Sequence, residues 1–400
     1  MTCQLSASCL SLACLVALAP AHASGQDTRA AEIADLQAAK AKAVQPYEPS
    51  RAERLATGLK KRLFESPDGF FPFFDSVYSG GGFTLGAGYR QYYGDRTFWY
   101  TRGLFSAKAY KLIEVATESP GMSQGRLDLR AVVGWRDATQ VAFYGVGGDT
   151  SPDAQSNFRM KQGYVGGALR ARGPAHTRVD VGLQYEDYSL EDGTGSSPTV
   201  DDVFTPTTAP GLGVSPTYLH LVTTGAIDWR QPGAGYARRG GLYALSYEGY
   251  FDRDDTHSFD TVQGEIVQHV PILRETWVLS FRGAARTTLD DEDQVPYFLL
   301  PSLGSGSTLR AYPSWRFRDR HSLLMSGEFR WIPSRMFLDI ALFYDAGKVT
   351  SRRADLDFSN LTGNWGIGVR FHGPVATPLR IEFARGREGT NIVFSGAAAF

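Results

Sequence analysis

Cysteine is almost absent from this 400-residue chain, and the three that occur, Cys3, Cys9 and Cys14, all lie near its start. The rest of the chain has no thiol, which excludes a disulfide framework and cysteine-ligated metal sites there. Charge is also sparse, with 21% charged residues and a formal net charge of -1. Because nucleic-acid binding needs a concentrated basic surface, this balance argues against nucleic acid as a partner.

Long hydrophobic runs are missing as well. From about Gly69 to Phe400 no uninterrupted apolar stretch approaches the length of a membrane-spanning helix. What is present instead is 44 glycines, 19 tyrosines and 12% aromatic residues, a composition that favours short strands and turns. The mildly negative mean hydropathy fits a soluble protein, but a barrel of alternating apolar and polar residues gives the same mean.

Residues 1–23 have the pattern of a cleaved secretion signal. An apolar core, Cys9 to Pro20, is too short to span a bilayer permanently, and a small-x-small motif ends at Ala23. We expect cleavage before Ser24, although the first eight residues contain no Lys or Arg. A lipid anchor on Cys14 is the weaker alternative, because Ser11 stands where a lipobox has an aliphatic residue.

Residues 24–68 are expected to form a helical leader. Alanine, glutamate, glutamine and lysine dominate its first half, and a capping box from Ser50 to Glu53 begins a second helix with Leu55, Leu59 and Leu63 on one face. Two interpretations are open. The leader is an amphipathic piece that docks in a barrel mouth or on a lipid surface, or it is a periplasmic helix packed on the barrel rim.

Apolar and polar residues alternate with a period of two in segment after segment of residues 69–400. In the stretch HSLLMSGEFRWI, Met325, Phe329 and Trp331 share one parity, whereas Ser326, Glu328 and Arg330 share the other. A soluble sheet hides its apolar face in a core, while a transmembrane barrel turns that face to lipid. The secretion signal and the aromatics at segment ends favour the barrel.

The segments number sixteen, an even count of the kind that a single-chain bacterial barrel requires. The longest connections, 191–217 and 290–318, alternate with short turns and are expected on the outer side. The predicted strands lie near 70–78, 81–93, 97–114, 124–137, 139–147, 157–172, 176–189, 217–231, 239–252, 258–271, 276–289, 319–332, 337–348, 364–373, 377–386 and 390–400.

The last predicted strand alternates Ile392 and Phe394 and stops on Phe400. A terminal Phe that closes an amphipathic strand resembles the C-terminal signal of bacterial outer-membrane proteins. Phe394 and Phe400 are therefore candidates for such a strand signal.

Two further motifs, TLRAYP and ALFYDAGKV, make the resemblance specific. Together with GGGFTLGAGYR and GNWGIGVRF, they resemble the barrel of the BamA/TamA superfamily of outer-membrane assembly proteins, also called the bacterial surface antigen family. In that family a long loop folds into the lumen and carries a V/I-R-G-F/Y motif, which here corresponds to Leu309, Arg310, Ala311 and Tyr312. A lumen-facing F-x-D-x-G motif corresponds to Phe343, Asp345 and Gly347.

The resemblance implies a latch between the loop and the wall. An arginine inside a lumen cannot lose its charge and needs carboxylate partners. We expect Asp345 to hold Arg310, with Glu328 as a second acceptor on the polar parity of its strand. Tyr312 is expected to pack near Phe343 and Gly347, with Gly347 leaving room for the loop backbone.

Two departures from the family pattern limit the resemblance. Ala311 replaces the family glycine and would be costly if that position required a positive φ. The family's periplasmic POTRA domains do not fit into about 45 residues ahead of the first strand, so we expect a barrel-only member. An imperfectly paired seam between the first and last strands could still template another strand.

Enzyme and metal hypotheses are weaker. Gly121 to Gly125 matches G-x-S-x-G around Ser123, but a nucleophile elbow needs a following helix, and another strand follows here. The acidic runs 252–255 and 290–293 have no EF-hand pattern and are expected to be hydrated loop charges. No zinc spacing or phosphate-binding loop occurs, so no cofactor is expected.

The sequence as a whole predicts an all-β, sixteen-stranded antiparallel transmembrane barrel in the bacterial outer membrane. The leading functional hypothesis is assistance in the insertion or translocation of proteins, or of lipids, with outer-membrane lipids and client outer-membrane or secreted proteins as partners. A passive pore or structural barrel is the alternative, and an outer-membrane lipase is the third hypothesis.

Overall fold

The structure is a computed structural model that describes residues 24–43, 50–51, 54, 68–73, 75–231, 237–290, 294–333, 338–371, 379–395 and 400. The chain divides into two units, Met1–Ala56 and Thr57–Phe400. In the first unit, α1 spans Ser24–Ala43, as the alanine-rich composition predicts. The predicted signal peptide and most of the predicted second helix lie outside the described residues. The expectation that no POTRA domain precedes the barrel stays a prediction.

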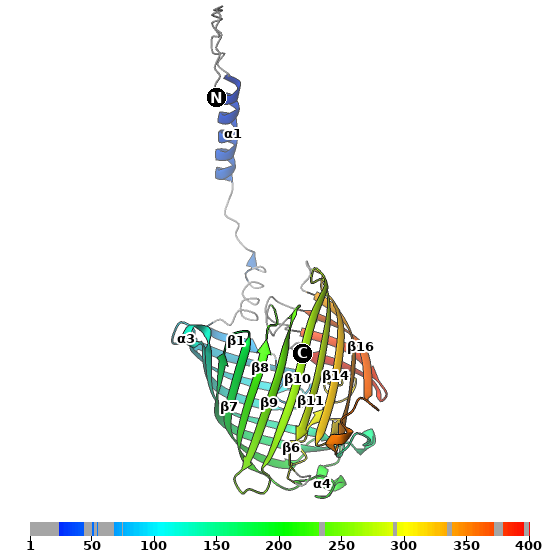
Figure 1. Ribbon diagram of the computed structural model, residues 1–400. Helices are drawn as coiled ribbons and strands as arrows, with labels where there is room; N and C mark the ends of the chain where they lie inside the picture. The colour runs from blue at the N-terminus through cyan, green and yellow to red at the C-terminus, as the bar shows by residue number, and fades with distance from the viewer. Residues whose placement is uncertain are drawn as a thin grey trace, which may run out of the picture. The chain divides into compact units, whose positions relative to one another are not determined.

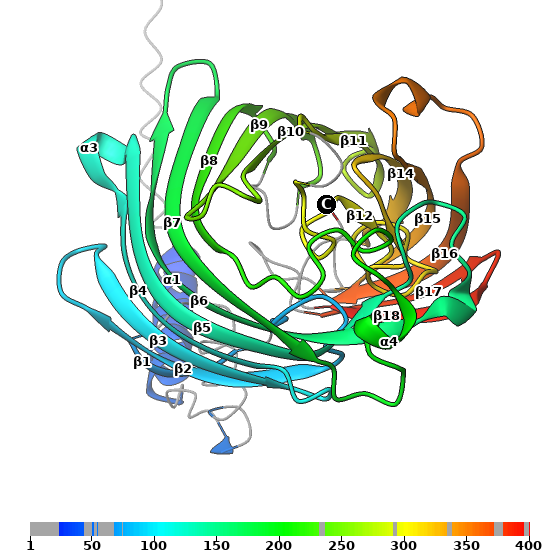
Figure 2. The same cartoon turned by 90° about the horizontal axis from the view of Figure 1, so that it is seen from below.

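The second unit contains sixteen strands that pair with their neighbours in one antiparallel sheet. Seen end on, these strands run round a central lumen (Figure 2), which confirms the predicted barrel. The strands of the sheet are β1 (Gly69–Phe73), β2 (Thr84–Tyr92), β3 (Phe98–Ser106), β4 (Lys111–Gly121), β5 (Leu127–Phe143), β6 (Ser156–Arg172), β7 (Thr177–Asp192), β8 (Thr217–Asp228), β9 (Gly240–Asp252), β10 (Phe259–Leu273), β11 (Trp277–Thr288), β14 (His321–Trp331), β15 (Leu338–Thr350), β16 (Thr362–Phe371), β17 (Leu379–Gly386) and β18 (Gly389–Ser395).

The remaining elements are short and lie in the connections of the barrel (Figure 1). The strands β12 and β13 pair only with each other, as a separate two-stranded sheet. Among the described residues, no helix is long and apolar enough to cross a membrane. These elements are α3 (Met122–Gly125), η1 (Pro152–Ala154), α4 (Val200–Val203), β12 (Ser302–Leu303), β13 (Phe317–Arg318) and η2 (Arg353–Asp355).

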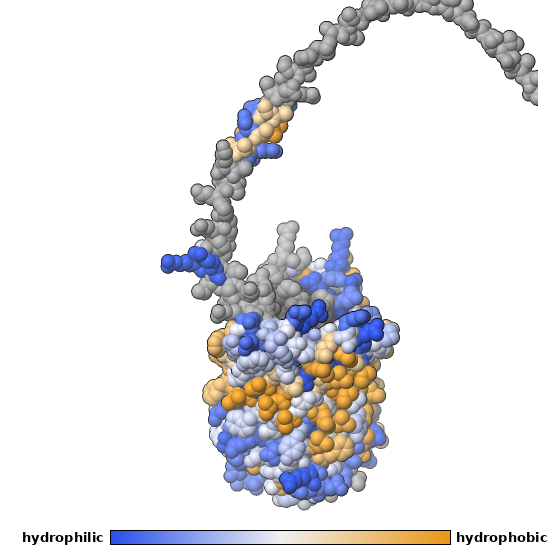
Figure 3. Space-filling model, turned by 90° about the vertical axis from the view of Figure 1, so that its left-hand side faces the viewer, coloured by the Kyte–Doolittle hydropathy of each residue, from blue (hydrophilic) through white to orange (hydrophobic). Residues whose placement is uncertain are grey.

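The predicted alternation is realised as an outer and an inner face. On β14 the side chains of Met325, Phe329 and Trp331 are exposed, whereas Glu328 and Arg330 between them are buried. The same alternation holds on other strands of the wall, and exposed apolar residues form a band across the face of the barrel seen in Figure 3. An apolar exterior around a polar interior is the arrangement that a barrel in lipid requires.

The count of sixteen strands is right, but one predicted strand is in fact two strands, and two predicted strands are in fact one. The predicted strand 97–114 is two strands, β3 and β4, because a tight turn containing Ala109 at φ 62° separates them. That turn has no Gly or Pro to reveal it. The predicted strands 124–137 and 139–147 are one strand, β5. A bulge between Ala138 and Val141 shifts its register, and the sequence pattern there was interpreted as a turn.

The connections differ in length between the two ends of the barrel. The end that carries the long connections 193–216 and 289–320 is called the loop end, and the opposite one, with turns such as 93–97 and 173–176, the turn end. Tyr297 and Phe298 of the second long connection belong to a buried aromatic cluster with Phe143, Phe158 and Tyr188 of the wall. The connection therefore returns into the lumen and fills part of it.

The seam between the first and last strands has no backbone ladder in the described part of the chain. The order of hydrogen-bonded neighbours runs from β1 to β18 without joining these two. The first strand is also short, with only five residues. Among the described residues, β1 and β18 are therefore the two edge strands of the sheet, and β1 offers only five residues for pairing.

Candidate functional site

The lumen loop, Gly304–Asp319, begins and ends at a two-residue ladder. Ser302 and Leu303 of β12 pair with Arg318 and Phe317 of β13, so the loop leaves and returns at one point. Gly304 has φ 100°, and a side chain there would meet the carbonyl oxygen of Pro313 at 2.3 Å. The turn therefore requires a glycine, which is the local reason that the chain can fold back here.

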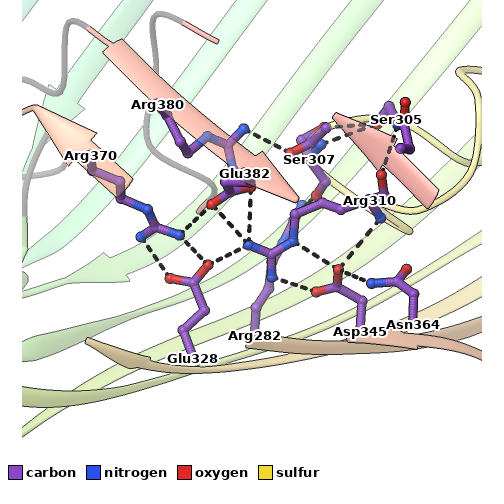
Figure 4. A network of polar contacts seen from close by, with 12 residues as sticks. Arg282, Ser305, Ser307, Arg310, Glu328, Asp345, Asn364, Arg370, Arg380 and Glu382 are labelled. Atoms are coloured by element: carbon purple, nitrogen blue, oxygen red, sulfur yellow. Dashed lines mark hydrogen bonds and ion pairs between the residues drawn. The ribbon is translucent and has the colours of Figure 1, made fainter. Parts of the chain in front are cut away.

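Arg310 lies at the centre of a buried polar network (Figure 4). Its Nε donates to Asp345 Oδ2 at 2.8 Å and its Nη2 to Asp345 Oδ1 at 2.7 Å. Its Nη1 donates to Glu328 Oε1 at 2.6 Å and also faces Glu382. The structure thus brings together the loop arginine and both carboxylates that the sequence nominated.

The network continues into two further wall strands. Arg370 of β16 donates to both oxygens of Glu328, at 2.8 and 2.6 Å, and to Glu382 at 2.7 Å. Arg380 of β17 donates to Glu382 Oε2 at 3.1 Å and to the carbonyl of Gly306 in the loop. Three guanidinium groups and three carboxylates therefore neutralise one another, which is the condition under which buried charges are tolerated.

The environment of Arg310 keeps it charged. Its guanidinium carbon lies 3.5 Å from the centre of the Phe343 ring, an additional cation–π contact. Burial by itself would lower the pKa of Arg310, but Glu328, Asp345 and Glu382 outweigh burial and raise that pKa above its ordinary value. Arg318, in the same loop, donates to the carbonyl of Tyr297 and has no carboxylate partner among the described residues, and burial lowers its pKa to about 10.

The other loop residues lie in part where the sequence indicated. Leu309, Ala311 and Tyr312 are buried in one cluster with Phe343. Ala311 is not among the described residues that have a positive φ, so replacing the family glycine does not strain the turn.

The glycine beside Tyr312 differs from the one expected. A side chain at Gly386 would meet the Tyr312 ring at 3.0 Å, and the Tyr312 hydroxyl donates to the carbonyl of Gly363 at 3.3 Å. Gly347 instead faces Leu303, at 2.9 Å from an added Cβ. The sequence placed Tyr312 near Gly347 and had Gly347 leave room for the loop backbone. The glycines in contact with Tyr312 are Gly363 and Gly386, and the loop residue that Gly347 faces is Leu303 at the base of the loop.

Sequence reasoning missed Glu382, Arg370, Arg380 and Asn364 as members of the site. Asn364 donates from Nδ2 to Asp345 Oδ2 at 2.9 Å and so helps to orient the carboxylate that binds Arg310. The first three stand on the polar parity of their strands, and this parity placed them in the lumen. The alternation does not predict the position of each residue along the barrel axis relative to the loop, so it could not show that these side chains reach Arg310.

The two candidate residues of the C-terminal signal lie on opposite faces. Phe394 is exposed on the outer wall, whereas Phe400 packs beside His269, Ala226, Leu242 and Val267. The predicted strand 390–400 ends at Ser395, and residues 396–399 lie outside the described residues. Phe400 therefore does not close the last strand as expected, and its role as a strand signal remains a prediction.

Other candidate sites gain no support from the geometry. Ser123 lies in a four-residue turn between β4 and β5 at φ 50°, and no histidine among the described residues bonds to it. A strand follows that turn, so the nucleophile-elbow geometry is missing. In the part of the chain that the structure describes, no cluster of three or more metal-binding side chains occurs, while residues 291–293 of the second acidic run lie outside it.

The comparisons with known proteins agree with this architecture. The Omp85 superfamily domain matches residues 105–394, which is more than half of the chain. No curated protein sequence matches the chain. Among solved structures, BamA from Haemophilus ducreyi lacking POTRA domains 1–3 is similar with 16% identity and a TM-score of 0.58, over 81% of this chain and 68% of that one. CdiB from Escherichia coli is similar with 12% identity and a TM-score of 0.51, over 82% of this chain. The match spans 61% of the length of CdiB.

Proposed function

Because the chain belongs to the Omp85 superfamily, we propose that it is an integral outer-membrane protein that assists the insertion or translocation of other proteins. The loop end would face the cell exterior and the turn end the periplasm, with residues 1–23 removed as a signal peptide and residues 24–68 as a periplasmic or lumen-docked leader. Clients would be outer-membrane or secreted proteins, and outer-membrane lipids would surround the apolar band.

The observation that carries this proposal is the seam. The strands β1 and β18 are the two edge strands of the sheet and share no ladder in the described chain. A sheet edge of this kind is a template for pairing with a third strand. Such an edge can template an incoming strand by β-augmentation, in which main-chain hydrogen bonds supply the affinity. Membrane lipid offers no hydrogen-bond partner to backbone groups, so a partner strand is the favourable neighbour of a sheet edge in the membrane.

The passive-pore alternative is disfavoured by the filled lumen. The buried Arg310 network and the aromatic cluster around Tyr297 occupy the interior at the loop end. A catalytic function is disfavoured by the turn that carries Ser123, so we propose that the protein is not an enzyme.

A seam-locking experiment tests the proposal. Cysteines replace the outward-facing Phe70 of β1 and Phe394 of β18 in a chain whose three native cysteines are changed to serine. Bifunctional thiol reagents of graded length then join them. In liposomes, the unlocked protein should accelerate insertion of an unfolded outer-membrane barrel, and locking should abolish this acceleration.

A second cysteine pair supplies the control. Leu129 of β5 and Leu169 of β6 are register partners on the outer face, so a bridge between them joins strands that already pair. This bridge should leave insertion unchanged. Insertion that continues at full rate through a locked seam, or no acceleration by the unlocked protein, would overturn the proposal.

A further inference from the structure

The lumen loop contacts both sides of the seam, where the described strands β1 and β18 share no ladder, through two consecutive residues. On the side of the first strand, Trp315 Nε1 donates to the carbonyl of Ser79 in the β1–β2 connection at 2.9 Å. The Trp315 ring also stacks on Tyr78, with the ring centres 4.9 Å apart and the planes at 22°. The first strand pair is therefore tied to the loop at the loop end.

On the side of the last strand, Arg316 is bound to the β17–β18 turn. Its Nε and Nη2 donate to the two carboxylate oxygens of Glu388 at 2.9 and 2.8 Å, a bidentate pair of the strong, directional kind. Its Nη1 donates to Thr150 Oγ1 of the β5–β6 connection at 2.8 Å. Because Arg316 is almost fully buried, water competes little for these bonds.

Neighbouring contacts hold the last strand to the loop along its length. The Tyr312 hydroxyl accepts a hydrogen bond from the backbone N–H of Arg387 at 3.2 Å, and Asn391 Nδ2 donates to the carbonyl of Arg310 at 2.9 Å. A side chain at Gly306 would meet Val393 at 2.5 Å, so the loop backbone lies directly against β18. The loop thus contacts β18, the edge strand that has no ladder with β1 in the described chain.

The backbone at this point is held in an uncommon conformation. Trp315 has φ 67°, in the left-handed region that a bulky residue rarely adopts. Such a conformation persists only where the surrounding contacts impose it. The contacts of Trp315 and Arg316 therefore hold the backbone of the loop in this conformation.

We propose that Trp315 and Arg316 form a clasp that closes the seam at the loop end, across the point where the backbone ladder is missing. The clasp joins the β1–β2 connection to the β17–β18 turn through side chains, and it must open before the two edges can separate. The closing role stands on the contacts alone, whereas the statement that opening precedes strand insertion rests on the proposed function.

The test measures the width of the seam without any client. Spin labels are placed on outward-facing positions on either side, Leu85 of β2 and Phe383 of β17, in the cysteine-free chain in lipid nanodiscs. Electron–electron double resonance then gives the distance distribution. Arg316→Gln, Glu388→Gln and Trp315→Leu should each shift it to longer distances and broaden it.

Two controls separate the clasp from a general loosening. A label pair on Val133 of β5 and Leu219 of β8 reports a part of the wall that does not include the seam strands and should not change in any variant. Arg352→Gln removes an exposed ion pair with Asp355 in the β15–β16 connection and should leave both pairs unchanged. Heat-modifiable mobility on gels checks that each variant has folded, and the charge exchange Arg316→Glu with Glu388→Arg should restore the narrow distribution.

Seam distances that equal those of the unmodified protein in both Arg316→Gln and Trp315→Leu would overturn the clasp. A shift of equal size in the Val133–Leu219 pair would overturn it too, because the variants would then loosen the whole barrel. Neither result depends on insertion activity, so failure of the clasp and failure of the proposed function are distinguishable.

Discussion

Arg310 and Asp345 face each other across 35 positions of sequence and share two hydrogen bonds, from Nε to Oδ2 at 2.8 Å and from Nη2 to Oδ1 at 2.7 Å. One residue belongs to a loop and the other to the barrel wall, so the pair fixes the loop inside the lumen. Both side chains are buried, with 1% and 0% of their surface exposed. The pair is therefore sensitive to the loss of either partner.

Removal of one partner should be costly. Arg310→Gln or Asp345→Asn leaves the opposite charge buried without its bidentate partner, and breaking a buried pair in this way costs about 3–5 kcal/mol. Reversible urea unfolding in lipid vesicles measures the change in the free energy of unfolding. The double variant should cost less than the sum of the two single changes. Arg352→Gln, at an exposed pair, is the control and should cost ~0–1 kcal/mol; equal losses at both sites would contradict the prediction.

Arg318 should respond in the opposite way to Arg310. It is fully buried but contacts aromatic rings and the carbonyl of Tyr297 rather than a carboxylate. Arg318→Met should therefore leave stability unchanged or raise it, whereas Arg310→Met should lower it. The pKa of Arg318, about 10, lies below its ordinary value, so burial disfavours the charged form at every pH below 10.

The pH dependence of that variant follows from the same shift. Between pH 6 and pH 8 the arginine is protonated in both the folded and the unfolded chain, so no proton is exchanged on unfolding. The difference in unfolding free energy between Arg318→Met and the unmodified chain should therefore be the same at pH 6 and at pH 8. A difference that changes across this window would show that another group titrates with Arg318.

Gly347 should not tolerate a side chain. An added Cβ would lie 2.6 Å from the carbonyl oxygen of Leu323 and 2.9 Å from Leu303, and overpacking of this kind costs about 1–3 kcal/mol. Gly347→Ala should therefore lower the midpoint of urea unfolding. Gly264→Ala, in β10, is the matched control, because nothing lies within 4 Å of its added Cβ. Equal behaviour of the two variants would mean that the loop base moves away without cost.

The filled lumen predicts low ion conductance. In planar bilayers the unmodified protein should show small and infrequent openings, and Arg310→Ala should increase them, because the loop then loses its attachment to Asp345 and Glu328. Gel mobility before and after heating checks that the variant has folded. A large, steady, ion-selective conductance that Arg310→Ala leaves unchanged would contradict a lumen plugged by this loop and would favour the passive pore.

Much of the architecture was accessible from the sequence because a strand in a barrel wall has only two faces. Parity alone assigned Glu328, Arg370 and Glu382 to the lumen and Phe329 to the outside. Local signals failed where they were ambiguous. The turn at Ala109 has no glycine to reveal it, so two strands were predicted as one. The bulge in β5 was interpreted as a turn, so one strand was predicted as two, and the total of sixteen was unchanged.

The lumen site was accessible only in part. The resemblance to a known family nominated Arg310 and Asp345, the polar parity of its strand nominated Glu328, and these residues do lie together. The contribution of Glu382 could not be predicted, because the relative height of two strands depends on the tilt and register of the whole barrel. The sequence placed Gly347 beside Tyr312, whereas Gly386 lies there, and this difference also depends on the tilt and register of the strands.

The sequence by itself determined the class of this protein: an alternating, cysteine-poor chain whose polar residues point into a barrel and whose apolar residues point out. That information is local, since a period of two needs only neighbouring residues. The tertiary structure alone decided which charges meet Arg310, and that Trp315 and Arg316 reach both sides of the seam. The contacts of Trp315 with Ser79 and of Arg316 with Glu388 join residues 236 and 72 positions apart, and only the path of the chain round the lumen brings them together.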